Sequence, residues 1–405
     1  MESHTKNEGS AERVEEFGPG TIEAVIRERV RAMIEMVVET ELERALGAGP
    51  WQRAGGGRRG YRHGKRDRTV TTSLGPTTFA LPRARLRRAD GSEREWQSQT
   101  VERYQRRTKR VDEALVGVYL SGTNTRRIKS AVGPLLKGAP LAKDAISRLV
   151  GRLGEDFRAW QERDLRADDI CYLFLDGWYP KVRIAKRRER VPVLVVLGVR
   201  RNGERVLLDL RMAGDESQAA WADVLEKLVA RNIGCPEFAA IDGNPGLVAA
   251  LRKTWPTVRL QRCTAHKLRN LQAKAPASRR EELAEDYRRA VYGSDRAAVE
   301  KGRAAFVKKW RSRCPAVAAS FEEAGDELFT FLDYPQQQWR ALRTTNALER
   351  VNEEFRRRTK TQAVLPSQDA VLLLLFGLLA TGQIRHRLID GWQAMPQRVV
   401  EQDVA

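Results

Sequence analysis

The sequence is poor in cysteine and has no long hydrophobic run. Its four cysteines lie far apart and form no C-x-x-C motif, so neither a disulfide framework nor a zinc site of four thiolates is indicated. No apolar stretch approaches the ~18 residues of a membrane-spanning helix, and the N-terminal residues are charged rather than signal-like. Membrane, secreted and collagen-like proteins are therefore excluded, and a cytoplasmic protein is expected.

Acidic residues are scarce relative to basic ones. The 405 residues include 73 Lys and Arg against 53 Asp and Glu, which gives a formal net charge of +20 at pH 7. An excess of this size favours a polyanionic partner, and nucleic acid is the first candidate. Hydrophobic residues make up 41% of the chain, which suffices for real cores, and the length favours two or three domains.

The basic excess is concentrated in residues 51–110. The run Gly55–Gly64 reads GGGRRGYRHG and favours a flexible arm whose Arg58, Arg59 and Arg62 contact phosphates. The alternative is a solvated loop without a partner.

Two elements are predicted around this arm. Ile22–Leu46 has apolar residues at helical spacing, which predicts one amphipathic helix or two. Thr69–Leu81 is rich in threonine and punctuated by turn residues, which predicts a small β-hairpin.

Three helices are predicted between Val111 and Trp160. Ser121-Gly122 ends the first, and the third begins at Pro140 with an apolar residue at every fourth position. Short helices with a glycine-containing turn and a basic third helix fit a helix-turn-helix DNA-binding domain, although an ordinary three-helix bundle has the same pattern. The side chains expected to face DNA from the third helix are Lys143, Arg148 and Arg152.

The centre of the chain predicts a mixed α/β sheet. The expected strands are Ile170–Asp176, Lys181–Ala185, Val191–Val199, Val206–Met212, Glu237–Asp242 and Thr257–Arg262. Asn202-Gly203 predicts a hairpin turn, and helices are expected through Trp221–Leu228, through Leu247–Leu251 and from Thr264. This order is that of the ribonuclease-H-like fold, in which the ends of the Asp176 and Asp242 strands lie side by side.

Two carboxylates at neighbouring strand ends suit phosphodiester chemistry. Cleavage of a phosphodiester commonly uses two divalent ions ~4 Å apart, and Mg²⁺ prefers carboxylate and water ligands. Asp176 and Asp242 are candidates for this cage, and a third carboxylate is expected from a later helix, at Glu349 or one turn on at Glu353. Both aspartates could instead be polar strand ends, and Asn346 with Glu349 has the spacing of a helix capping box. Asp209 has a similar sequence context but lies inside a hairpin strand, away from that edge.

Six stretches, in order, resemble the insertion-sequence transposases of the Mutator type, which have a DDE catalytic triad. The stretches are YRHG with PRAR, LSGTNTRRI, LDGWYPKVR, IDGNPGL, QRCTAHKLRN and TTNALERVNEEFRRRTK. The resemblance implies Asp176, Asp242 and Glu349 as catalytic residues that hold two Mg²⁺ ions, for which Mn²⁺ would substitute. It also maps the family's Cys-x-x-His signature onto Cys263 and His266.

Function, partners and domains follow from the resemblance. It implies a transposase that binds the terminal inverted repeats of its element and cleaves and joins DNA strands. It also implies a homodimer or larger assembly on DNA, located in the cytoplasm and associated with the nucleoid when bound to DNA. Arg356 and Arg357 are expected to contact DNA. The alternatives are a non-enzymatic DNA-binding regulator and a structure-specific nuclease. The expected domains are a disordered tail (1–20), a helical region with basic arm and hairpin (21–100), a helix-turn-helix domain (101–167), a ribonuclease-H-like core (168–275 and 339–390), an all-helical insertion (276–338) and a C-terminal tail (391–405).

Two smaller predictions concern single side chains. Two ligands are too few for structural zinc, so Cys263 and His266 are expected to organise a helix behind the active site, with His266 near Asp242 or DNA. In the insertion, Lys and Arg residues surround Trp310; they could contact DNA near the cut site, but the preferred interpretation of Trp310 is a core residue of a helical bundle.

Overall fold

A computed structural model describes residues 22–52, 57–120, 128, 132, 143–184, 187–190, 192–361, 368–382, 384 and 386–395. The chain divides into two compact units; in the described residues the boundaries fall between Tyr119 and Leu120, at the end of one helix, and between Leu149 and Val150, within another. None of the helices in this described part is long and apolar enough to cross a membrane.

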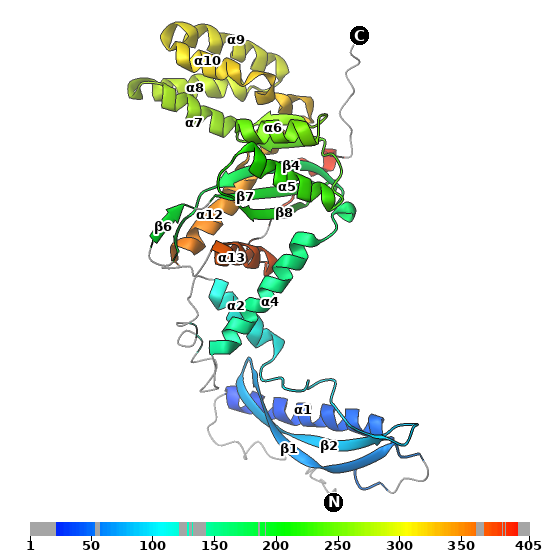
Figure 1. The fold of residues 1–405 in the computed structure, drawn as a ribbon. Coiled ribbons are helices and arrows are strands. Elements are labelled where there is room, and N and C mark those ends of the chain that lie inside the picture. Colours follow the sequence, from blue (N-terminus) through cyan, green and yellow to red (C-terminus); the bar gives the residue numbers. More distant parts are fainter. Residues whose placement is uncertain are drawn as a thin grey trace, which may run out of the picture. The chain divides into compact units, whose positions relative to one another are not determined.

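The first unit contains a helix on an antiparallel sheet (Figure 1). Its elements are α1 (Ile22–Leu46), β1 (Gly60–Thr72), β2 (Gly75–Arg87) and β3 (Glu93–Glu95), with strand order β1-β2-β3. The apolar face of α1, with Val38, Leu42 and Leu46, packs on Phe79 and other residues of the sheet. The single helix over Ile22–Leu46 is one of the two alternatives that the sequence left open.

This sheet corrects two predictions, the flexible basic arm at Gly55–Gly64 and the small hairpin at Thr69–Leu81. The hairpin is much longer than Thr69–Leu81, because β1 starts at Gly60 and takes in the second half of the supposed flexible arm. Gly60 is required there, since a Cβ atom would lie 1.9 Å from the carbonyl oxygen of Arg85. Arg62 is half-buried and pairs with Glu39 of α1, so it contributes to packing within the unit.

The helix-turn-helix can be followed only in part. Its first and third helices are α2 (Lys109–Leu120) and α4 (Lys143–Glu162). The apolar series on α4 is buried, as its spacing predicted (Ala145, Leu149, Leu153 and Phe157). The turn and most of the second helix lie outside the described residues, so the motif stays a prediction.

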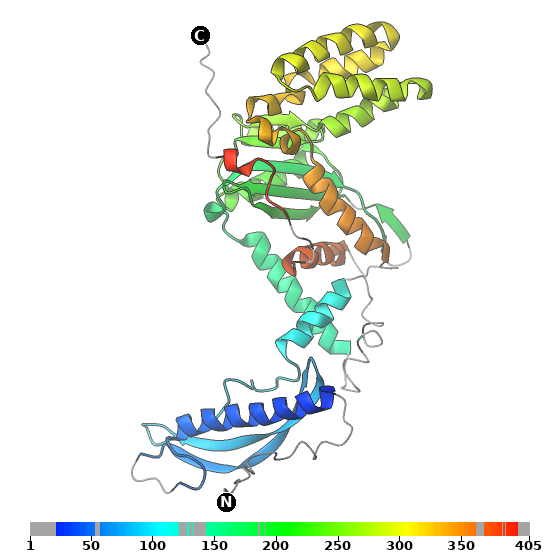
Figure 2. The ribbon, with the colours of Figure 1, turned by 180° about the vertical axis from the view of Figure 1, so that it is seen from behind.

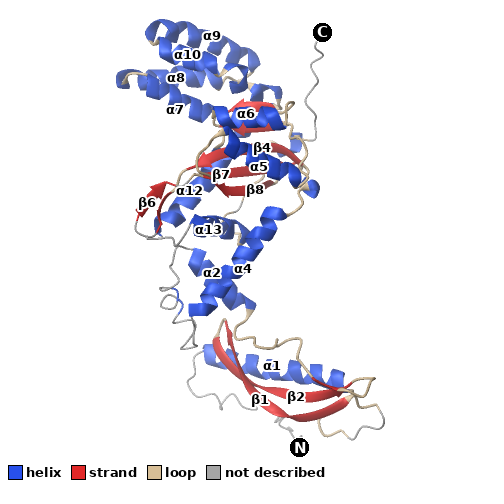
Figure 3. Cartoon of the chain, in the orientation of Figure 1, coloured by secondary structure: helices blue, strands red, loops and turns tan. Residues whose placement is uncertain are grey.

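A five-stranded mixed sheet forms the centre of the second unit (Figure 3). In chain order the strands are β4 (Ile170–Trp178), β7 (Val193–Arg200), β8 (Arg205–Met212), β9 (Phe238–Ile241) and β10 (Arg259–Arg262). They are arranged β10-β9-β4-β7-β8; β4, β7 and β8 pair antiparallel, whereas β9 runs parallel to both β4 and β10. The predicted strand at Lys181–Ala185 exists as β5 (Lys181–Ile184), but it pairs with β6 (Arg187–Arg190) outside this sheet.

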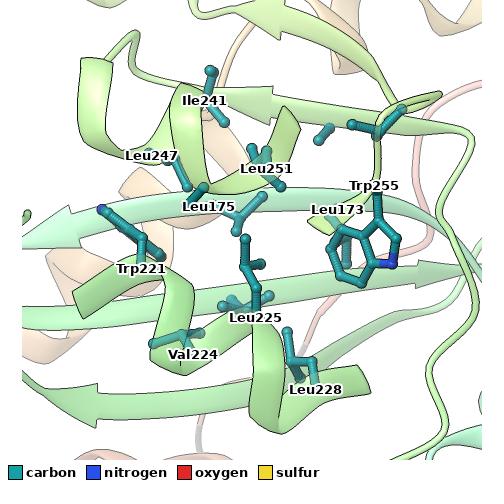
Figure 4. Close-up of a cluster of buried hydrophobic side chains, with 14 of the residues drawn as sticks. Leu173, Leu175, Trp221, Val224, Leu225, Leu228, Ile241, Leu247, Leu251 and Trp255 are labelled. Carbon is teal, nitrogen blue, oxygen red and sulfur yellow. The ribbon is translucent and has the colours of Figure 1, made fainter. Parts of the chain in front are cut away.

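Two helices cover one face of the sheet, and the sequence predicted a helix at both positions. They are α5 (Gln218–Ala230) and α6 (Pro245–Thr254). Figure 4 shows Trp221, Leu225 and Leu228 of α5 with Leu173 and Leu175 of β4 in one buried cluster. Because side chains alternate along a strand, Phe174, Asp176 and Trp178 face the other side of β4.

The remaining helices follow β10. They are α7 (Thr264–Lys274), α8 (Arg280–Val291), α9 (Arg296–Arg313), α10 (Pro315–Glu323), α11 (Gln336–Leu342), α12 (Asn346–Thr361) and α13 (Gln368–Ala380). The helices predicted within Arg279–Leu332 are thus present as α8, α9 and α10. α12 lies on the face of the sheet opposite α5 and α6 (Figures 1 and 2), where Phe355 packs 5.6 Å from Trp178, measured between ring centroids.

Candidate active site

The first two candidate carboxylates lie on adjacent parallel strands. Tyr172 of β4 lies beside Phe238 of β9, and Phe174 lies beside Ala240. Extending this register by two residues brings Asp176 beside Asp242. Asp176 is within β4 rather than at its last residue, and Asp242 directly follows β9.

The residues after Asp242 turn the chain sharply into α6. Gly243 has φ +94°, which favours glycine. The Asn244 side chain caps α6 by accepting from the N–H groups of Gly246 and Leu247, and Pro245 opens the helix. The N–H of Asn244 donates to Asp242 Oδ1 at 2.9 Å. The turn therefore fixes the second carboxylate at the edge of the sheet.

Glu349 lies in the first turn of α12. The carbonyl of Thr345 accepts from the N–H groups of Leu348 and Glu349, so Thr345 is the N-cap and Asn346 is the first residue of the helix. The alternative of a capping box from Asn346 to Glu349 is therefore not met. One turn later, Asn352 is 4% exposed and its Nδ2 donates to Asp176 Oδ2 at 3.1 Å. This bond ties α12 to the face of β4 that carries Asp176.

Asp176 and Glu349 share one cavity of about 450 Å³. Asn352, Glu353, His266, Arg269 and Arg356 also line it. Asp242 lines a second cavity of about 780 Å³, together with Arg262, Lys267 and Glu323. The structure thus brings the three predicted carboxylates to one region, with Asp242 on the side toward α10.

Negative charge is crowded around Asp176. Burial is the main cause that raises the pKa of Asp176 to about 7; His266 lowers this pKa, and the nearby Asp242, Glu216 and Glu349 carboxylates contribute to the increase. Glu349 pairs with Arg269 at 2.9 Å. Within the described part of the chain, Asp176, Asp242 and Glu216 form no ion pair with a basic side chain. A cation from outside the chain would relieve this repulsion.

The Cys-x-x-His pair lies behind Glu349. Cys263 is buried as the N-cap of α7, and its Sγ accepts from the N–H and the Oγ1 of Thr345, both at 3.4 Å. His266 Nε2 is 3.8 Å from Glu349 Oε1, so the carboxylate beside it is that of Glu349, and the alternative of a contact with DNA stays a prediction. The hydrogen bond to Cys263 raises the pKa of His266 to about 9. The pair thereby joins the start of α7 to the start of α12.

Glu216 is a site residue that the sequence did not reveal. It lies in the loop before α5, and Asn244 Nδ2 donates to its Oε2 at 3.1 Å. Burial raises the pKa of Glu216, as does Asp242, while hydrogen bonds from Tyr179 and Asn244 act against them. No sequence motif marks this position, because its proximity to Asp176 and Asp242 arises only from the packing of the loop on the sheet.

The predicted DNA-binding residues are mostly exposed: Arg58, Arg59, Arg148, Arg152, Arg356 and Arg357. Arg357 also pairs with Glu354 of the same helix. Arg62 is half-buried and pairs with Glu39. Lys143 begins α4, but its side chain lies outside the described residues.

The donor groups at the ends of β4 and β9 suit a metal ion that keeps part of its water shell. In the described residues, no three or more His, Cys, Asp or Glu side chains are grouped closely enough to hold a metal ion. Mg²⁺, however, is commonly held by one or two carboxylates with water and phosphate oxygens. Asp176 beside Asp242 provides such a pair, and the buried Oδ1 of Asn352 has no hydrogen-bond partner in the described structure. The residues present therefore fit a divalent cation.

Similar proteins are insertion-sequence transposases. Residues 3–385 match the family described as transposase, Mutator family. The chain is 33% identical over 353 residues to the transposase for insertion sequence element ISRM5 of Rhizobium meliloti, covering 87% of this chain and 86% of that protein. It is also 33% identical over 355 residues to the transposase for insertion sequence element IS406 of Burkholderia multivorans, covering 87% and 89%. These matches show that the chain belongs to the Mutator family of transposases.

Proposed function

We propose that this transposase binds the terminal inverted repeats of its element and cleaves and joins DNA strands at the β4–β9 edge. By this edge we mean the C-terminal ends of the neighbouring strands β4 and β9, where Asp176 and Asp242 lie. The observation that carries the proposal is the register of β4 and β9, which brings Asp176 beside Asp242. The strand order of the second unit supports a ribonuclease-H-like fold, in which the helices α8–α10 would be the insertion.

Asp176 and Asp242 would hold Mg²⁺, with Glu349 as the third ligand. The bound ions would supply activation of the attacking oxygen and stabilisation of the leaving oxygen. Asn352 holds Asp176 through its Nδ2. Arg269 pairs with Glu349 in the DNA-free chain. A DNA phosphate in the cavity would compete with Glu349 for this guanidinium, and it would also bind the exposed Arg356.

DNA binding by the N-terminal half is supported by its exposed basic residues. Arg58 and Arg59 precede β1, and Arg148 lies on α4, which contains the third helix of the predicted helix-turn-helix. Two active sites would be needed to process both element ends, which supports a homodimer or larger assembly on DNA.

The triad is tested by charge-neutral variants. Asp176→Asn, Asp242→Asn and Glu349→Gln should bind an end duplex like the wild type. Cleavage in Mg²⁺ or Mn²⁺ should fall on the order of 1,000-fold or more, because metal-held charge stabilisation contributes several kcal/mol to the transition state.

A gel assay of cleavage and strand transfer on labelled end duplexes measures both steps. Wild-type cleavage without joining would identify a nuclease instead. Full cleavage by Glu349→Gln would mean that Glu353, and not Glu349, is the third metal ligand. Full cleavage by Asp176→Asn would refute the proposed site.

A further inference from the structure

Glu216 fits closely against the residue that follows Asp176. A Cβ atom on Gly177 would lie 1.5 Å from Glu216 Oε1 and 2.1 Å from its Cδ. The carboxylate therefore occupies the space that any side chain at position 177 would fill. Its position depends on glycine there.

The same carboxylate is linked to the second aspartate. Asn244 Nδ2 donates to Glu216 Oε2 at 3.1 Å, and the backbone N–H of Asn244 donates to Asp242 Oδ1 at 2.9 Å. Asn244 thus connects the two acids while it caps α6. Glu216 lies between the ends of β4 and β9, in contact with the residue after Asp176 and with a residue that binds Asp242.

A buried amide oxygen provides an independent indication of a ligand. Asn352 is 4% exposed and lines the cavity with Asp176; its Nδ2 is bound to Asp176, but its Oδ1 has no hydrogen-bond partner in the part of the chain that the structure describes. Buried polar atoms are nearly always paired. An oxygen without a donor beside crowded carboxylates suits a cation or its water.

We propose that Glu216 is a fourth carboxylate of the active site, which helps Asp176 and Asp242 to hold a divalent cation through a bound water. The inference rests on the proposed function, because it assumes that this edge binds Mg²⁺ or Mn²⁺. Carboxylate oxygens are the preferred ligands of both ions. Groups that contact a metal through water or through a first ligand commonly change its affinity 10- to 100-fold.

The first test measures Mn²⁺ binding to the full-length, DNA-free protein. Free Mn²⁺ is followed by electron paramagnetic resonance during a titration. Glu216→Gln should weaken Mn²⁺ binding about 10-fold, and Asp176→Asn should weaken it at least as much. Glu226→Gln, the same change at an exposed position of α5, is the matched control and should bind like the wild type.

A second variant displaces the carboxylate without removing it. Gly177→Ala places a methyl group where Glu216 lies, so it should weaken Mn²⁺ binding to a similar extent as Glu216→Gln. Gly214→Ala is its control, because a Cβ atom there meets nothing within 4 Å. Wild-type affinity in Gly177→Ala would show that the placement of Glu216 against Gly177 has no part in cation binding.

Thermal unfolding in metal-free buffer separates this role from a structural one. Glu216→Gln should unfold at the same temperature as the wild type or higher, because it removes charge repulsion from Asp176 and Asp242. A lower unfolding temperature with unchanged Mn²⁺ affinity would make Glu216 a structural acceptor for Asn244 and would overturn the inference. If Asp176→Asn weakens binding but Glu216→Gln does not, only the inference fails. If Asp176→Asn and Asp242→Asn also bind Mn²⁺ like the wild type, the proposed function fails.

Discussion

The acidic residues of the helices α8–α10 differ in their partners from those at the β4–β9 edge. Glu282 pairs with Lys309 and Arg313, Asp286 with Lys309, and Glu322 with Arg311. At the β4–β9 edge, Asp176 accepts a hydrogen bond from Asn352, and Asp242 accepts one from Asn244. Glu216 accepts hydrogen bonds from Asn244 and Tyr179. No ion pair is recorded for these three in the described residues.

This difference separates structural acids from acids that suit a ligand. An acid with an Arg or Lys partner has its charge compensated inside the chain, and each of these pairs in α8–α10 joins two helices. Glu349 is the exception among the site carboxylates, because its partner Arg269 would be drawn away by a DNA phosphate. Carboxylates without such a partner repel one another, which costs stability unless a cation binds. The two regions therefore predict opposite outcomes for mutation: loss of stability where charges and side chains are satisfied, and loss of activity where they are not.

The largest effect on stability is expected in the helical region. Trp310 is fully buried, packs on Phe306, and donates from Nε1 to Asp286 Oδ2 at 3.0 Å. Trp310→Ala should cost about 3–5 kcal/mol of unfolding free energy, because a large side chain and a buried hydrogen bond are lost. Urea denaturation followed by circular dichroism measures this.

Lys308→Ala is the control for Trp310→Ala, since Lys308 is exposed on the same helix and should unfold like the wild type. A stable Trp310→Ala protein that binds and cuts DNA but does not join strands would instead assign Trp310 to DNA contact.

Sequence patterns predicted the second unit well because its strands are apolar. The runs Ile170–Asp176 and Val191–Val199 are nearly continuous hydrophobic segments, as expected for strands covered on both faces. The topology then placed the Asp176 and Asp242 strands side by side. The sequence could not give the register, because β4 and β9 are separated along the chain by β7, β8 and α5, and the offset between the two strands is set by long-range packing.

Patterns were less informative in the first unit and at Glu216. In β1 charged residues occupy both faces, and Arg62 reaches Glu39 where an apolar residue would mark the buried side, so the alternation typical of a strand is hidden. The glycines of this run suggested flexibility, although Gly60 is needed for close packing on Arg85. Glu216 was missed because its position depends on the open space above Gly177, which no local pattern encodes.

A smaller loss of stability is expected when Asp209, a buried carboxylate outside the proposed site, is replaced by Asn. Asp209 is 0% exposed, and its Oδ2 is 2.7 Å from Arg211 Nε. Asp209→Asn should cost about 1–3 kcal/mol, because a buried, charge-paired hydrogen bond is weakened, but DNA cleavage should persist.

The matched control for Asp209→Asn is Asp223→Asn, whose exposed pair with Lys227 should contribute at most about 1 kcal/mol. Thermal unfolding and the cleavage assay are run on both variants. A folded Asp209→Asn protein without cleavage would mean that Asp209 belongs to the active site, and the contrast between paired and unpaired acids would be broken.

The same contrast applied to basic residues gives the smallest effect, a change in the salt dependence of DNA binding. Arg58 and Arg148 are exposed, and no partner for either is recorded among the described residues, whereas Arg62 pairs with Glu39. If the first two contact phosphates, Arg58→Ala and Arg148→Ala should each lower the slope of log K against log salt by about 1, since each contact releases about one counterion. Arg62→Ala should leave the slope unchanged and lower the stability of the first unit, because it leaves Glu39 without its partner. Fluorescence anisotropy with an end duplex over a range of salt concentrations measures the slopes. A reduced slope for Arg62→Ala with unchanged slopes for the other two would mean that the ion pair with Glu39 opens on DNA, and that pairing in the free chain does not identify structural charges in this unit.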